Sequence, residues 1–158
     1  MLVMAFLAEP NLSNSEPSAT IPMVECEING FGLGGPADQM RTVFGEPEPI
    51  SIAKSPTGEY PHREYRYDGI RFVFSTHGRS AMSYFVSSPK YRLRSGVGVG
   101  STRAEIDEAL GSGRRGRSGD SNYLTNHVIG ADDQYIPAWL TFRLVDDVVT
   151  TFSVTTRQ

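Results

Sequence analysis

Two short stretches of the chain carry apolar residues at positions i, i+3 and i+4, the spacing of an amphipathic helix. These apolar positions are Met40, Val43 and Phe44 in the first stretch, and Ile106, Ala109 and Leu110 in the second. Each stretch ends in a glycine, Gly45 or Gly111, as expected where a helix stops in the left-handed region. The segments 31–45 and 97–111 align without gaps, which indicates an internal repeat.

The two helices are expected to begin differently. Thr102 and Glu105 have the spacing of a capping box, in which each side chain binds the backbone amide of the other residue. The first stretch instead offers Gly35 as the cap and Pro36 as the first helical residue.

After the first helix the period changes to two, which is typical of strands. His62 to Tyr67 and Ile70 to Ser75 flank Asp68-Gly69, a strong signal for a two-residue hairpin turn. That turn places alternate residues on one core face, continued by a third strand. The predicted core positions are Tyr65, Tyr67, Ile70, Phe72, Phe74, Met82, Tyr84 and Val86.

The second half has the same alternation if its hairpin loop holds three residues, Val145 to Asp147. The positions then predicted to face inward are Leu140, Phe142, Leu144, Val148, Phe152 and Val154. Those predicted to face outward are Trp139, Thr141, Arg143, Val149 and Thr151.

The pattern predicts an α+β fold of two tandem repeats, each a short helix followed by an antiparallel sheet, packed as one body. Residues 23–93 form the first repeat and residues 94–158 the second. Residues 1–22 are rich in Pro, Ser and Asn after seven mostly apolar residues, and are interpreted as a flexible leader or the remnant of a signal segment. No transmembrane segment is expected.

The segment Gly98 to Gly111, followed by strands, resembles the unit of the β-lactamase inhibitor protein family and of small outer-membrane-assembly lipoproteins. The resemblance covers roughly Phe31 to Val154 and is one of pattern. It implies a bacterial envelope protein that holds a partner on a concave sheet. The chain lacks the paired cysteines of the secreted inhibitors, since Cys26 is its only cysteine.

Composition and spacing argue against several chemistries. A net charge of −3 disfavours a nucleic-acid protein. The three histidines have no metal-ligand spacing, and neither a metal nor a cofactor is expected. Cys26 lies in a predicted strand between two glutamates, which raise a thiol pKa and disfavour a nucleophile. The glycine-rich run 96–102 is interpreted as a structural turn, not a phosphate loop.

The sheet face opposite the helices is the preferred binding site, because Trp, Phe and Arg there are typical of protein interfaces. The predicted partner-binding residues are Trp139, Phe85, Arg66, Arg71, Val73, Arg143 and Val149. In the alternative interpretation, Trp139 covers the seam between repeats and the arginines pair with Glu64. Arg114, Arg115 and Arg117 form a second, basic loop that either grips an acidic partner or is merely solvated.

These features favour a non-enzymatic protein-binding module, similar to an inhibitor or immunity protein, whose partner is another protein such as a hydrolase or toxin. The alternatives are an outer-membrane assembly or structural factor, and a small hydrolase with an unrecognised site. A periplasmic or secreted location is expected, with the cytoplasm as the alternative. The oligomeric state is left open.

Overall fold

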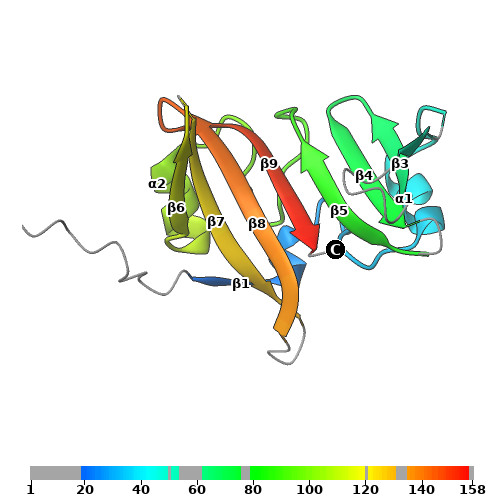
Figure 1. The fold of residues 1–158 in the computed structure, drawn as a ribbon, viewed down its shortest axis with the longest axis horizontal. Helices are drawn as coiled ribbons and strands as arrows, with labels where there is room; N and C mark the ends of the chain where they lie inside the picture. The colour runs from blue at the N-terminus through cyan, green and yellow to red at the C-terminus, as the bar shows by residue number, and fades with distance from the viewer. Residues whose placement is uncertain are drawn as a thin grey trace, which may run out of the picture.

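The computed structural model describes residues 19–49, 51–53, 62–75, 79–119, 121–130 and 135–156. The fold is α+β, with two helices and one mixed, mostly antiparallel sheet in a single body (Figure 1). The helical elements are η1 (Met23–Cys26), α1 (Ala37–Phe44) and α2 (Arg103–Leu110). The strands before α2 are β1 (Thr20–Pro22), β2 (Ser51–Ala53), β3 (His62–Tyr67), β4 (Ile70–Ser75) and β5 (Ala81–Val86). Those after it are β6 (Arg114–Ser118), β7 (Ser121–Ile129), β8 (Tyr135–Val145) and β9 (Val148–Thr156).

The described strands follow the order β1-β7-β8-β9-β5-β4-β3-β2, and β6 also pairs with β7. All pairs are antiparallel except β1 with β7. The N-terminal half (β2 to β5) and the C-terminal half (β6 to β9) meet where Ser83–Val86 of β5 pair with Phe152–Thr155 of β9. Figure 1 shows the two strands diverging beyond this short contact. The halves therefore share one sheet and one backbone ladder.

Both helices form as predicted and differ at their first residue. Thr102 caps α2 with the complete capping box, because Thr102 Oγ1 accepts from the Glu105 amide and Glu105 Oε2 accepts from the Thr102 amide. In α1 the cap is Pro36 and not the predicted Gly35, and no side chain of the cap residue binds a backbone amide of the first turn. Gly45 and Gly111 end the helices at positive φ, which confirms both predicted stops.

The first hairpin has the predicted register, with Tyr67 opposite Ile70 and Tyr65 opposite Phe72. The third strand departs from the prediction because of a β-bulge. Val73 lies opposite Ser83 and Phe74 opposite Ala81, so Met82 is the extra residue. Ala81, at 3% exposure, therefore takes the core position that was predicted for Met82.

The second hairpin corrects the prediction of a three-residue loop. Val145 pairs with Val148 across a two-residue turn, Asp146-Asp147, whose residues both have positive φ. A bulge at Thr150 then restores the alternation, so that Phe142 still lies opposite Phe152. The prediction was thus wrong for two residues: Val149 is buried in the core at 1% exposure, while Val148 is exposed.

One hydrophobic core lies between the helices and a single face of the sheet. Phe72 is fully buried, and its ring packs against those of Phe31 and Phe44 at centroid distances of 5.3 and 5.0 Å. Ile106 of α2 and Phe142 of β8 belong to the same buried cluster. Because both helices lie on this inner face, no described helix covers the opposite face of the sheet (Figure 1).

Each helix is attached to the sheet through an equivalent pair of backbone hydrogen bonds. Gly34 donates to Ala81, which donates to Gly35, at 2.9 Å each. In the second half, Gly100 donates to Val149 at 2.9 Å, and Val149 donates to Ser101 at 2.8 Å. The glycine-rich run before α2 is therefore used as a turn, as the sequence predicted.

The N-terminal segment differs from its prediction in two ways. β1 joins the sheet and Ile21 is 1% exposed, so the end of the predicted leader (residues 20–22) belongs to the folded body. Cys26 ends a 3-10 helix instead of lying in a strand. The thiol of Cys26 is buried by this single helical turn, and not by the alternation of inward and outward side chains that a strand would have.

Candidate partner-binding face

The candidate site is the outer face, defined as the sheet face opposite α1 and α2. Strand register places its residues in cross-strand rows that pass through both halves without interruption. One row runs through His127, Trp139, Thr155, Ser83, Val73 and Glu64. The adjacent row runs through Thr125, Thr141, Ser153, Phe85, Arg71 and Arg66. A partner lying across the strands can thus contact both halves at once.

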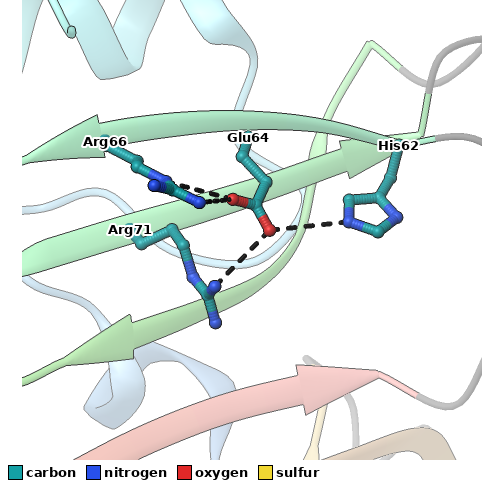
Figure 2. Close-up of polar contacts among 4 residues, drawn as sticks. All are labelled: His62, Glu64, Arg66 and Arg71. Atoms are coloured by element: carbon teal, nitrogen blue, oxygen red, sulfur yellow. Dashed lines mark hydrogen bonds and ion pairs between the residues drawn. The ribbon is translucent and has the colours of Figure 1, made fainter. Parts of the chain in front are cut away.

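In the N-terminal half, a charged cluster forms around Glu64 on β3 (Figure 2). Arg66 donates to Glu64 Oε2 through Nε and Nη2 at 3.1 and 2.7 Å. Arg71 Nη1 donates to Glu64 Oε1 at 3.4 Å, and His62 Nε2 lies 3.6 Å from the same oxygen. The cluster draws on two neighbouring strands, because residues i and i+2 share a face and Arg66 lies opposite Arg71.

The Glu64 carboxylate holds this cluster together. Burial alone raises the pKa of this carboxyl group, but the hydrogen bond from Arg66 and the charges of Arg71 and Arg66 together lower it below the usual value. Glu64 is therefore ionised at neutral pH and accepts hydrogen bonds from both guanidinium groups. The arginines pair with Glu64, as the alternative interpretation of the sequence had it.

A shallow groove of about 450 Å³ lies beside the cluster, where β5 and β9 diverge. Arg66, Arg71 and Phe85 contribute to its lining together with Glu48 and Thr151. The Arg71 guanidinium lies 4.4 Å from the centroid of the Phe85 ring, in cation–π contact. The groove therefore combines fixed positive charge with an aromatic surface.

The C-terminal half of the outer face has no buried carboxylate among its described residues and consists mainly of hydroxyl and aromatic side chains. Thr125 Oγ1 and Thr141 Oγ1 lie 3.2 Å apart, and the rings of His127 and Trp139 lie 5.8 Å apart. Arg143 is exposed and donates to Ser121 Oγ at 2.8 Å. This half thus presents hydroxyl groups and a half-buried tryptophan.

Six of the seven residues predicted as partner-binding lie on the outer face, and Val149 does not because of the Thr150 bulge. Val73 is on this face but only 6% exposed, since β4 is an interior strand flanked by Glu64 and Ser83. The predicted basic loop is strand β6, paired with β7 throughout and fully exposed. Arg114 shares the outer face through its partner Thr125, whereas Arg115 and Arg117 lie on the other side.

Sequence reasoning missed the contribution of β7. The alternation of Leu124, Asn126 and Val128, which all face inward, could have revealed this strand. Asn126 broke the apolar pattern, yet it is buried because its side-chain amide donates to the Ala19 carbonyl at 3.0 Å. The outer residues Thr125 and His127 follow from that register.

Burial shifts the pKa of three other groups, Cys26, Tyr67 and Tyr84. Burial, reinforced by the charge of Glu25, raises the pKa of Cys26 to about 12. Burial also raises the pKa of Tyr67 and of Tyr84, and the Tyr84 hydroxyl donates to the Cys26 carbonyl.

Within the described residues, no group of three or more His, Cys, Asp and Glu side chains is placed to hold a metal ion. The helices described there are all too short and polar to cross a bilayer.

Comparison with known proteins identifies the fold but no family. No family model matches the chain, and no curated protein matches it in sequence. An extracellular protein containing an SCP domain from Bacillus anthracis aligns with a TM-score of 0.51 and 11% identity, over 98% of this chain and 50% of that one. A cysteine-rich secretory protein from Staphylococcus aureus aligns with a TM-score of 0.51 and 12% identity, over 90% of this chain and 52% of that one.

The chain therefore spans about half the length of these two structures. A "putative beta-lactamase inhibitor protein" from Streptococcus mutans aligns over 77% of this chain and 83% of that one, with 14% identity and a TM-score of 0.32. No fold relationship is inferred from the last value, so the resemblance to the inhibitor family rests on the sequence pattern.

Proposed function

We propose that this chain is a non-enzymatic protein-binding module, of the kind found in inhibitor and immunity proteins, and that it binds its partner on the outer face. The observation that carries the proposal is the outer face itself. It is a continuous sheet surface that no described helix covers, and it presents Trp139, Phe85 and the arginines. Such residues bury large areas at modest entropic cost and are enriched at binding hot spots.

The pKa shifts of Cys26 and Glu64 argue against these two residues as a catalytic nucleophile and a general base. A cysteine nucleophile reacts as the thiolate, and a general base works best with a pKa near the working pH. The Cys26 thiol is instead kept protonated with a pKa of about 12, and the ionised Glu64 is held by hydrogen bonds from two arginines.

We further propose that the fold arose by tandem duplication of one helix-plus-sheet unit. The sequences of the α1 and α2 regions align without gaps. Gly34 and Gly100 occupy equivalent positions and donate equivalent hydrogen bonds to the sheet. The isolated bridges Pro36 to Ser80 and Thr102 to Val148 also correspond.

We assign the module to the bacterial cell exterior or envelope. The two structures with a TM-score of 0.51 are described as an extracellular and a secretory protein. A location outside the cytoplasm suits a module that binds a secreted hydrolase or toxin.

Site-specific photo-cross-linking tests the binding proposal. A benzoylphenylalanine residue is introduced at Phe85 or Trp139 of the full chain, and at Gln39, an exposed residue of α1, as the matched control. After irradiation in an extract of the source organism, mass spectrometry should identify one specific partner from positions 85 and 139 and none from 39. Cross-links from position 39 alone would place the interface on the helices and reject the outer face.

A further inference from the structure

The described strands of the outer face carry more basic than acidic side chains, although the chain as a whole has a net charge of −3. On the described strands, the charged residues on this face are Arg66, Arg71, Arg114 and Arg143 against the single acid Glu64. The acidic excess must therefore lie on the helices, the turns and the other parts of the chain. A surface that opposes the net charge of its own molecule favours a partner of the opposite sign.

The charge nearest the groove is also held in place. The Glu64 side chain is 8% exposed, whereas those of Arg66 and Arg71 are 54% and 39% exposed. Glu64 thus fixes two guanidinium groups from beneath and leaves each with N–H groups that face solvent. Arginines held in this way lose little conformational entropy when they receive a carboxylate.

An apolar surface lies directly beside these donors. Phe85 lines the groove and stacks against Arg71, so its ring supplies an apolar surface next to the guanidinium group. Glu48 lies at the same groove and is exposed, so it opposes an incoming acid. The groove therefore combines two attractive charges with one repulsive charge, the combination that produces selectivity.

We propose that the groove receives an acidic segment of the partner protein, with a carboxylate between Arg66 and Arg71 and an apolar side chain of the same segment on Phe85. Arg143 lies on β8 opposite Thr151, which lines the groove, and it is placed to receive a second acid. This inference rests on the proposed function and specifies the chemistry of the partner.

The test uses the full chain and a random dodecapeptide library displayed on phage. Selected peptides should contain two or more Asp or Glu residues next to an aromatic or aliphatic residue. Their affinity, measured by fluorescence polarisation, should fall with added salt. Selection of peptides without acidic enrichment, or of none, would overturn the proposal.

A matched pair of variants separates a specific site from a general effect of charge. Arg66→Gln with Arg71→Gln should weaken the selected peptides at least about tenfold. Arg63→Gln with Arg79→Gln removes the same charge from exposed arginines that line a different cavity, and should change the affinity less than about twofold. Equal losses in both variants would reject the site.

Two further variants guard against misfolding and test the direction of the charge effect. The triple variant Glu64→Gln, Arg66→Gln, Arg71→Gln leaves no buried carboxylate without partners, so it keeps the fold and should also lose the peptides. Glu48→Gln removes the repulsive charge and should strengthen binding about two- to threefold. Weaker binding of this variant would contradict the proposed placement of the acid.

A single-stranded RNA 20-mer serves as the other anionic probe. If it binds as tightly as the peptides, and if that binding depends on Arg66 and Arg71, the assignment to a protein segment is wrong. A photo-cross-link from position 85 to a partner segment without acids would also reject this inference, while it would leave the proposed function standing. Loss of all cross-links from the outer face would reject the proposed function itself.

Discussion

The two halves of the sheet use different means to stabilise the same outer face. In the N-terminal half, a buried carboxylate fixes exposed arginines, whereas the C-terminal half has paired threonines and a tryptophan. Beneath them the halves share one core and meet through four residue pairs of β5 and β9. The comparison separates two properties: the core is common to both halves, while the buried carboxylate of Glu64, and the pH dependence that follows from it, belong to the first half.

The strongest test of the shared core is a substitution that creates a cavity in one half while unfolding is followed by the fluorescence of a tryptophan in the other half. Phe72→Ala removes a fully buried ring from the N-terminal half and should lower the free energy of unfolding by about 3–5 kcal/mol. The only tryptophan, Trp139, lies in the C-terminal half. Its fluorescence and the far-UV circular dichroism should shift to the same lower midpoint, because one body unfolds as a unit.

Phe142→Ala is the matched change in the C-terminal half, since this ring is also fully buried. It should move both signals together by a similar amount. A variant in which the fluorescence and dichroism midpoints separate would show that the halves unfold independently.

The two hairpin turns should respond unequally to the same residue. Gly69→Asp gives the first turn the Asp-Asp sequence of the second, and we expect a cost of about 2–3 kcal/mol. Gly69 has a φ of +81°, and a Cβ atom there would lie 2.2 Å from the Ser88 Cβ. Chemical denaturation measures the loss, and Ser88→Gly should recover part of it. A cost below 0.5 kcal/mol would refute this account of the turn.

These turns also explain how far the fold could be predicted. The dipeptide Asp68-Gly69 is typical of a two-residue hairpin turn, and a turn of known length fixes which residues pair. The register of β3 and β4 was therefore predicted pair by pair. Asp146 and Asp147 adopt positive φ without a glycine. The bulge at Thr150, which moves Val149 into the core, has no residue signal at all. Tertiary packing sets such bulges, and alternation alone cannot locate them.

The candidate site was predictable in position but not in energetics. Alternation placed Arg66, Arg71 and Phe85 on one face because strand parity is a local property. The burial of Glu64 and Val73 depends on strands that are distant in sequence. Strand β6 could not be predicted, since an exposed strand needs no apolar alternation and forms through its backbone pairing with β7.

The charged cluster of the N-terminal half should make the stability of the whole protein depend on pH. The pKa of Glu64 is lower in the folded protein than in the unfolded chain, so its contribution is fully present above the ordinary carboxyl pKa of about 4.3. The contribution is lost as the pH falls through the lower, folded pKa. Glu64→Gln should therefore destabilise the protein by about 1–2 kcal/mol at pH 7, and the difference from wild type should shrink below about pH 4.

Thr141→Val is the control from the other half, because it removes a hydroxyl group paired with Thr125 and no charge. Its effect on the melting temperature should be the same at pH 7 and pH 4. If Glu64→Gln shows an equally flat profile, the carboxylate does not stabilise this face through its charge.

The smallest difference between the halves lies at the first turn of each helix. Thr102→Ala breaks the capping box of α2 and should cost about 1 kcal/mol, whereas Thr102→Ser keeps an accepting hydroxyl and should cost much less. Pro36→Ala in α1 loses no side-chain hydrogen bond, because Pro36 makes none to the helix. Its cost should be limited to the greater freedom of the unfolded chain, a few tenths of a kcal/mol. Thermal denaturation of the three variants measures this order, and equal losses for Thr102→Ala and Pro36→Ala would show that the capping box does not distinguish the two helices.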